Sequence, residues 1–193
     1  MKKCFFVFVL GCLSAFANIP VIGEKASHFS VETTKGKVDF PEHYAGKWMV
    51  LFSYPSAFTP LCTEEMKKVH SMIDNFESLQ AELVGLSIFS VEDHKKWLES
   101  MPYGKKITLI SDSEKKMGLQ YGMFHPITEP KTIRSVYIID PKGVIRAMWF
   151  YPSKTGRNFD EILRVLASIQ ATDREGGYTG PLWKEGEKPA RLP

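Results

Sequence analysis

The feature that most constrains this chain is a buried strand that passes into a helix through a proline-rich turn. Residues 49–54 are mostly apolar, as expected of a strand covered on both faces. Residues 64–79 carry apolar side chains at intervals of three or four, which predicts an amphipathic helix. The turn between them contains Cys62. We therefore expect Cys62 at or near the first helical turn, where the helix dipole and free backbone N–H groups favour a thiolate.

The rest of the pattern alternates strands and helices. Strands are predicted in residues 29–33, 37–40, 47–53, 82–88, 107–110, 135–140 and 144–149. Further helices are predicted in residues 92–100, 113–121 and 158–169, the first two with Ser90 and Ser113 as N-caps. Such alternation favours an α/β protein with helices on both faces of its sheet.

The N-terminus has the features of a signal peptide. Lys2 and Lys3 precede an apolar stretch, and Ala15-Phe16-Ala17 forms an A-x-A cleavage site. We expect residues 1–17 to be removed and the protein to be exported to the periplasm or another extracytoplasmic compartment. The alternative is a lipid anchor on Cys12, which follows a weak lipobox-like stretch.

The mature chain is predicted to have one domain and a tail. Residues 18–171 are long enough for a single core, and residues 172–193 are rich in glycine, proline and charge and lose periodicity. We treat the partner subunit as a candidate docking site for that tail. The formal net charge of +3, without a basic stripe, gives no support for nucleic-acid binding.

Cysteine usage points to a reactive thiol. Cys4 and Cys12 lie in the leader, so the cleaved chain keeps Cys62 alone and can form no internal disulfide. A lone cysteine in an exported protein suggests a reactive thiol or a disulfide with another molecule. The five histidines are scattered, and no glycine-rich nucleotide motif occurs, so we expect neither a metal nor a cofactor.

The motif Pro55-x-x-x-Thr59-x-x-Cys62 resembles the active-site motif of the peroxiredoxins, the AhpC/TSA family. Residues 134–140 resemble the family segment that carries its invariant arginine, and residues 90–97 and 183–187 are similar to the one-cysteine, peroxiredoxin-6-like branch. The resemblance implies a thioredoxin-like fold with a central mixed sheet. It also implies thiol-dependent reduction of hydrogen peroxide and organic hydroperoxides.

The resemblance assigns the main catalytic roles. Cys62 would attack the peroxide and become a sulfenic acid. Arg134, which stays protonated, would hold the thiolate and the charge that develops on oxygen. Thr59 would hydrogen-bond the sulfur or the peroxide, and Pro55 would shield the thiolate from water. Taken singly, Arg134 could equally be a surface ion pair and Thr59 a helix cap.

Three supporting residues are also expected. Glu65 would brace Arg134 or Arg157, although Glu65 could be a solvated charge and Arg157 could pair with Asp160 on the surface. Tyr54 stands where one-cysteine relatives often carry histidine, which would alter hydrogen bonding at the site. Lys47 replaces the serine associated with phospholipase activity in some relatives, so we expect no such activity.

The same resemblance predicts partners and leaves rivals open. Because no resolving cysteine follows Cys62, an external thiol that is thioredoxin-, glutaredoxin- or glutathione-like must regenerate it. A homodimer or higher oligomer is expected. The rival hypotheses are a redox-regulated holdase chaperone or peroxide sensor, and a protein that tethers another through a mixed disulfide.

Overall fold

The computed structural model describes residues 19–101, 106–124 and 131–191. The predicted signal peptide and Cys12 lie outside these residues. The described strands are β1 (Phe29–Thr33), β2 (Gly36–Phe40), β3 (Trp48–Ser53), β4 (Ala81–Ser87), β5 (Thr108–Ser111), β6 (Arg134–Ile139) and β7 (Ile145–Tyr151). They form one sheet in the order β2-β1-β5-β4-β3-β6-β7. Strands β3, β4 and β5 pair in parallel and the other pairs are antiparallel, which confirms the mixed sheet.

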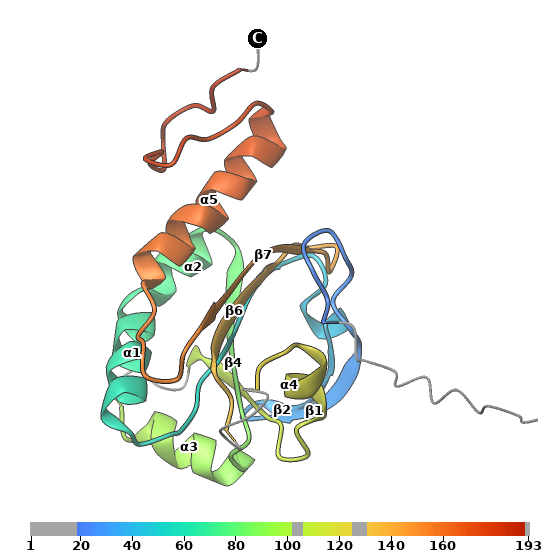
Figure 1. Cartoon of the computed structure of the whole chain (residues 1–193), viewed down its shortest axis with the longest axis vertical. Coiled ribbons are helices and arrows are strands. Elements are labelled where there is room, and N and C mark those ends of the chain that lie inside the picture. The colour runs from blue at the N-terminus through green and yellow to red at the C-terminus, as the bar shows by residue number, and fades with distance from the viewer. Residues whose placement is uncertain (1–18, 102–105, 125–130, 192–193) are drawn as a thin grey trace, which may run out of the picture.

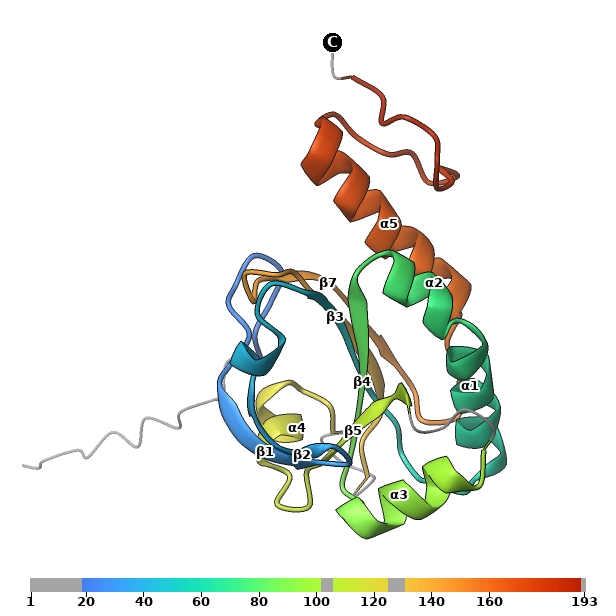
Figure 2. The ribbon, with the colours of Figure 1, turned by 180° about the vertical axis from the view of Figure 1, so that it is seen from behind.

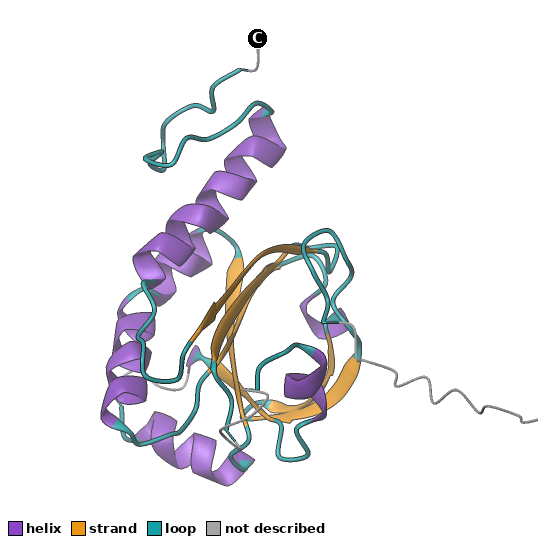
Figure 3. Cartoon of the chain, in the orientation of Figure 1, coloured by secondary structure: helices purple, strands orange, loops and turns teal. Residues whose placement is uncertain are grey.

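Helices cover both faces of this sheet, as predicted. They are α1 (Pro60–Ser71), α2 (Ile73–Ser78), α3 (Val91–Glu99), α4 (Lys116–Gln120) and α5 (Phe159–Glu175), with a short 3₁₀ turn η1 (Glu42–Tyr44). Helices α1, α2, α3 and α5 lie on one side of the sheet and α4 lies on the other (Figures 1 and 2). The layered order of helix, sheet and helix is visible in Figure 3.

Strand β3 is buried on both faces because successive side chains alternate across the sheet. Val50 and Phe52 pack with α1, α2, α3 and α5 in one apolar cluster. Met49 and Leu51 pack in a second cluster on the opposite face, with α4 and the β1–β2 hairpin. Each such side chain contributes about 1.5–3 kcal/mol through burial, so β3 is a rigid support for the turn that follows it.

The helix after β3 differs from its prediction in two ways. It begins at Pro60 rather than at residue 64, because proline at the first helical position needs no N–H partner and already has a helical φ. It is also two helices, α1 and α2, separated at Met72, whose φ of −109° and ψ of 4° leave the α-helical range. The apolar spacing continues across this break, which is why the sequence pattern does not show it.

Of the two predicted N-caps, one is corrected and one is confirmed. Ser113 is not the cap of α4, because the Asp112 carboxylate accepts the N–H groups of Met117 and Gly118 at 3.2 and 2.7 Å and the helix starts only at Lys116. Ser90 is confirmed as the cap of α3, since its Oγ accepts from Asp93 N at 3.1 Å.

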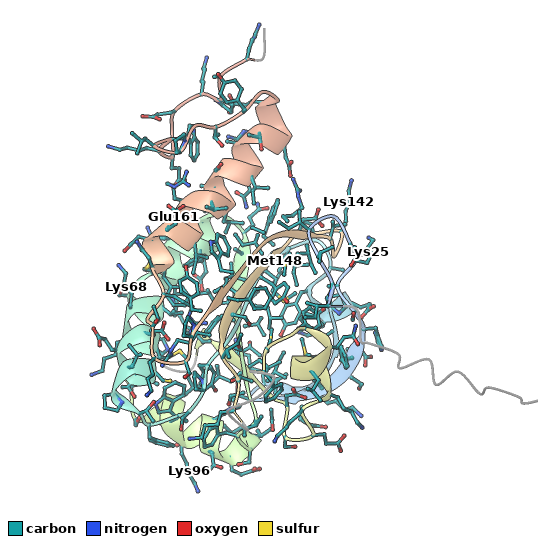
Figure 4. All side chains as sticks on the ribbon, in the orientation of Figure 1. Lys25, Lys68, Lys96, Lys142, Met148 and Glu161 are labelled. Carbon is teal, nitrogen blue, oxygen red and sulfur yellow. The ribbon has the colours of Figure 1, made fainter. Side chains whose placement is uncertain are left out.

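Helix α5 continues past the predicted boundary at residue 172 and ends at Glu175, and the tail folds back beside it (Figure 1). Trp183 of the tail is buried against Ala167 and Ala171 of α5, and its ring N–H donates to Glu187 O at 2.9 Å. At the other end of α5, Lys68 of α1 forms an ion pair with Asp160 at 2.9 Å, and Lys68 and Glu161 lie at the outer surface there (Figure 4). Within the described residues, no helix has the length and apolarity needed to cross a membrane.

Candidate active site

The turn after β3 places Cys62 at the start of α1. Tyr54 N still pairs with Leu86 O at 3.1 Å, and the chain then turns through Pro55, which is buried. Thr59 is the N-cap residue, with an extended backbone, and its carbonyl accepts the first helical hydrogen bond from Thr63 N at 2.9 Å. Cys62 is the third residue of α1 and only 2% exposed. The sequence prediction for this position is therefore confirmed.

Thr59 does not cap the helix with its side chain. Its Oγ1 instead donates to Ser56 O at 2.9 Å, which ties the turn together. Phe58, just before it, has a φ of 61°, in the left-handed region that non-glycine residues rarely adopt. The turn holds this strained residue while its ring remains largely exposed.

Arg134 approaches Cys62 from β6. The antiparallel pairing of β6 with β3 brings the first residue of β6 beside the end of β3, although Arg134 is distant in the chain. Arg134 Nη2 donates to Cys62 Sγ at 3.3 Å, and Arg134 Nε donates to Ser153 O at 2.8 Å. The guanidinium is thus fixed on one side by backbone and faces the sulfur on the other.

Glu65 joins both arginines. Its Oε2 accepts from Arg134 Nη1 and, at 2.9 Å, from Arg157 Nη2. Its Oε1 accepts from Arg157 Nε at 3.1 Å and from the backbone Arg157 N at 2.7 Å. The sequence left open which arginine Glu65 braces, and the structure shows that it braces both.

Arg157 is anchored to the ends of two strands. Its Nη1 donates to the carbonyls of Ser53 on β3 and Ser135 on β6, at 2.7 and 2.9 Å. The two serine hydroxyls also bond each other at 2.8 Å, and Ser53 Oγ donates to Ile133 O at 2.7 Å. Sequence reasoning missed these serines. The available signal was a serine at the end of each of two apolar strands.

The charged cluster beside Cys62 carries a net positive charge. Arg134 and Arg157 contribute two positive charges and Glu65 one negative charge. Burial alone would raise the pKa of Glu65, but hydrogen bonds and charge attraction from Arg157, and the charge of Arg134, lower it overall. Burial lowers the pKa of Arg157, which Glu65 opposes. A site of this kind can hold negative charge on sulfur and on an oxygen next to it.

Tyr54 contacts α3 beside the Cys62 turn. Its ring packs against Trp97 and His94 of α3, with ring centroids 5.0 and 5.8 Å away, and its carbonyl accepts from Thr132 Oγ1 at 2.7 Å. Burial raises the pKa of the Tyr54 phenol, and the neighbouring Ser87 hydroxyl partly offsets that effect. Tyr54, which we expected to alter hydrogen bonding at the site, lies in the same buried cluster as Cys62, and Cys62 adds to the rise in its pKa.

Comparison with known proteins identifies the family of this site. The model of the AhpC/TSA family matches residues 22–148. The chain belongs to the AhpC/TSA family. Its relatives include a peroxiredoxin of Nanoarchaeum equitans, 41% identical over 84% of this chain and 75% of the relative, and one of Thermotoga maritima, 40% identical over 88% and 81%. These likenesses support a peroxidase that depends on a thiol.

Solved peroxiredoxin structures have the same thioredoxin-like fold. Peroxiredoxin 6 of Arenicola marina superposes with a TM-score of 0.84 at 32% identity, over 90% of this chain and 84% of that one. A yeast mitochondrial one-cysteine peroxiredoxin gives 0.78 at 35% identity, over 86% and 84%. The resemblance to the one-cysteine branch is therefore supported. In residues 19–101, 106–124 and 131–191, no three His, Cys, Asp or Glu side chains are grouped so that they could bind a metal.

Proposed function

We propose that Cys62 is the residue that reduces peroxide in this peroxiredoxin. The thiolate attacks one peroxide oxygen, an S–O bond forms and the O–O bond breaks. The sulfur is oxidised by two electrons to a sulfenic acid, and the departing oxygen takes a proton and leaves as water or an alcohol. The observation that carries this proposal is the 3.3 Å contact between Arg134 Nη2 and Cys62 Sγ at the first turn of α1.

Arg134, Thr59 and Pro55 act with Cys62 in this proposal. Arg134 stabilises both the thiolate and the charge on the departing oxygen. The hydroxyl hydrogen of Thr59 is engaged with Ser56 O, so its oxygen is left to accept a hydrogen bond from the peroxide. Buried Pro55 closes the turn against water and, having no N–H, leaves no unpaired donor there.

Glu65 and Arg157 are positioning residues. They hold Arg134 in place, because Arg134 and Arg157 both bond the Glu65 carboxylate. The negative charge of Glu65 also offsets the repulsion between the two guanidinium groups.

A simple experiment tests the role of Cys62. The protein is treated with one equivalent of hydrogen peroxide, and its intact mass and the stopped-flow rate are measured. We expect one added oxygen on the wild type and neither that oxygen nor a fast phase in Cys62→Ser. A Cys62→Ser variant that consumes peroxide at the wild-type rate would refute the proposal.

An external thiol completes the proposed cycle. Cys62 is the only cysteine among the described residues, so a second thiol there is not available for a disulfide. The yeast one-cysteine relative is described as resolved through glutathione and thioredoxin systems, which supports the same class of reductant here. Oxidised protein should regain its thiol with a thioredoxin-, glutaredoxin- or glutathione-type reductant, measured as turnover. Full turnover with peroxide alone would contradict this step.

We also propose a homodimer formed through β7. This strand is the last in the sheet order; its first residue, Ile145, bonds Gly23 and Glu24, but the rest of its outer edge has no described strand beside it, and Phe150 is 43% exposed. An open apolar edge is a template for pairing with a second copy. Sedimentation should give twice the mass of the mature chain, and a monomer at micromolar concentration would argue against pairing.

We also propose that residues 1–17 direct export of the protein. Export with cleavage after Ala17 predicts a mature mass that begins at Asn18, whereas a lipid on Cys12 predicts a heavier, acylated N-terminus. Intact mass of protein purified from cells distinguishes these outcomes, and a full-length unmodified chain would refute both.

A further inference from the structure

Helix α3 contacts the Cys62 turn from the inside of the fold. His94 and Trp97 lie three residues apart, hence on the same face of α3, and both are almost completely buried. Trp97 packs against Tyr54 at 5.0 Å and Phe58 at 6.4 Å between ring centroids, and its Nε1 donates to Thr63 Oγ1 at 3.3 Å. One helix therefore contacts the turn before and after the cysteine.

His94 fixes this helix to the sheet through a polar contact. His94 Nε2 and the Ser87 hydroxyl at the end of β4 share a hydrogen bond of 2.8 Å, and Ser87 Oγ also accepts from Phe89 N at 3.3 Å. The His94 ring lies 5.8 Å from the Tyr54 ring. Ser87, His94 and Tyr54 thus form one buried contact group, which we name the rear cluster.

The polar groups of the rear cluster reduce the stability of the fold relative to apolar side chains of the same size. His94 Nδ1 is buried without a hydrogen-bond partner in the part of the chain that the structure describes, whereas the Tyr54 hydroxyl lies close enough to the Ser87 hydroxyl for that group to lower its pKa. An unpaired buried atom such as Nδ1 costs about 1–3 kcal/mol, and an apolar side chain of similar size would avoid that cost. Burial also lowers the pKa of His94 to about 4, against a smaller opposite effect of Asp93, so the imidazole is neutral near pH 7. A neutral ring can share the hydrogen bond with Ser87 without placing a charge in the core.

The cluster connects to the reacting atoms through Tyr54. Hydrogen bonds to Leu86 and Thr132 hold the backbone of Tyr54, and contacts with His94 and Trp97 hold its ring. Pro55 follows directly, so backbone and ring together set the direction in which the chain enters the turn. A shift of that direction would move Cys62 Sγ relative to Arg134 Nη2, because the Arg134 guanidinium is anchored separately through Nε at Ser153 O. Small displacements of this kind are expensive in rate because reacting groups must be held within a fraction of an ångström.

We propose that His94 is a positioning residue for the peroxide reaction, acting through Ser87 and the Tyr54 ring to hold Cys62 Sγ beneath Arg134. This inference rests on the proposed role of Cys62. His94 itself does not touch the sulfur or the substrate.

Two substitutions at the same position separate positioning from packing. His94→Leu fills the space and removes the hydrogen bond to Ser87, whereas His94→Gln keeps a neutral group that can bond Ser87. Each variant is made in the full chain. The rate at which Cys62 reacts with hydrogen peroxide is compared with the rate at which iodoacetamide alkylates it. The surface substitution His28→Gln serves as the control, because His28 is exposed and its ion-pair partner Glu42 is exposed as well.

We expect His94→Leu to react with peroxide about 10-fold or more slowly, with no fall in alkylation, and His94→Gln to regain most of the rate. A wild-type peroxide rate in His94→Leu, or a His94→Gln variant as slow as His94→Leu, would overturn the inference. If His94→Leu does not fold, Ser87→Ala replaces it, with the same slow peroxide reaction expected and a wild-type rate overturning the inference. Wild-type protein that reduces peroxide without oxidising Cys62 would instead refute the proposed function itself.

Discussion

Replacing Glu65 by glutamine tests the charge arrangement behind Cys62. The carboxylate accepts four hydrogen bonds from Arg134 and Arg157, and all three side chains are nearly buried. A glutamine amide keeps one acceptor oxygen but turns an NH₂ group toward at least one guanidinium. The substitution therefore removes the compensating negative charge and places a donor against donors.

The cost follows from the burial of the pair. Removing one partner of a buried ion pair costs about 3–5 kcal/mol, because the other charge is left uncompensated. In a domain of this size, 1 kcal/mol corresponds to about 2–4 °C in melting temperature, so Glu65→Gln should lower it by roughly 10 °C. The unanchored Arg134 should also slow the peroxide reaction.

Urea unfolding and the stopped-flow peroxide reaction measure the two effects. The matched control is Glu64→Gln, since Glu64 is the adjacent residue but is exposed. We expect Glu64→Gln to change stability by less than about 0.5 kcal/mol. If Glu65→Gln lost less than about 1 kcal/mol and kept the wild-type rate, the reasoning from the buried charge cluster would be refuted.

Three further predictions follow from the same structure. Arg134→Lys should slow the peroxide reaction about 100-fold in stopped flow, because lysine lacks the forked donors that reach both Sγ and Glu65. The control Arg164→Lys should react at the wild-type rate. Equal rates for Arg134→Lys and the wild type would contradict this role of Arg134. The pKa of His94 is about 4 in the folded protein and near 6.5 when the chain is unfolded. The unfolded state therefore takes up the proton first as the pH falls. The free energy of unfolding should be fully retained above pH 6.5 and fall by roughly 3 kcal/mol as the pH drops toward 4. Urea unfolding should show that the free energy of unfolding falls less with pH in His94→Gln than in the wild type. The same pH dependence in both proteins would exclude His94 as the cause. Trp183→Ala should make the tail sensitive to limited proteolysis and leave the peroxide rate unchanged, because Trp183 is buried against α5. Leu182→Ala, which changes an exposed side chain, should leave the tail resistant. A tail equally resistant in both variants would show that Trp183 does not hold it.

The sequence alone determined the local architecture around the cysteine. The apolar run of β3, the two prolines of the turn and the helical spacing that follows predict a strand, a turn and a helix with Cys62 in its first turn. These are local properties, since periodicity and proline chemistry act over a few residues. For the same reason the sequence missed the break at Met72, which leaves the apolar spacing intact, and the capping of α4 by Asp112, which competes with a nearby serine.

Tertiary structure decided which distant groups meet at the sulfur. Periodicity shows which side of a strand is buried, but it does not give the neighbour of that strand. Only the antiparallel pairing of β6 with β3 brings Arg134 to Cys62, and only the return of the chain toward α5 brings Arg157 to Glu65. The contact of His94 with Ser87, only seven residues away, depends on how α3 turns back on the end of β4. Such contacts arise when the whole core closes, because burying each charge or polar group is tolerable only once its distant partner is in place.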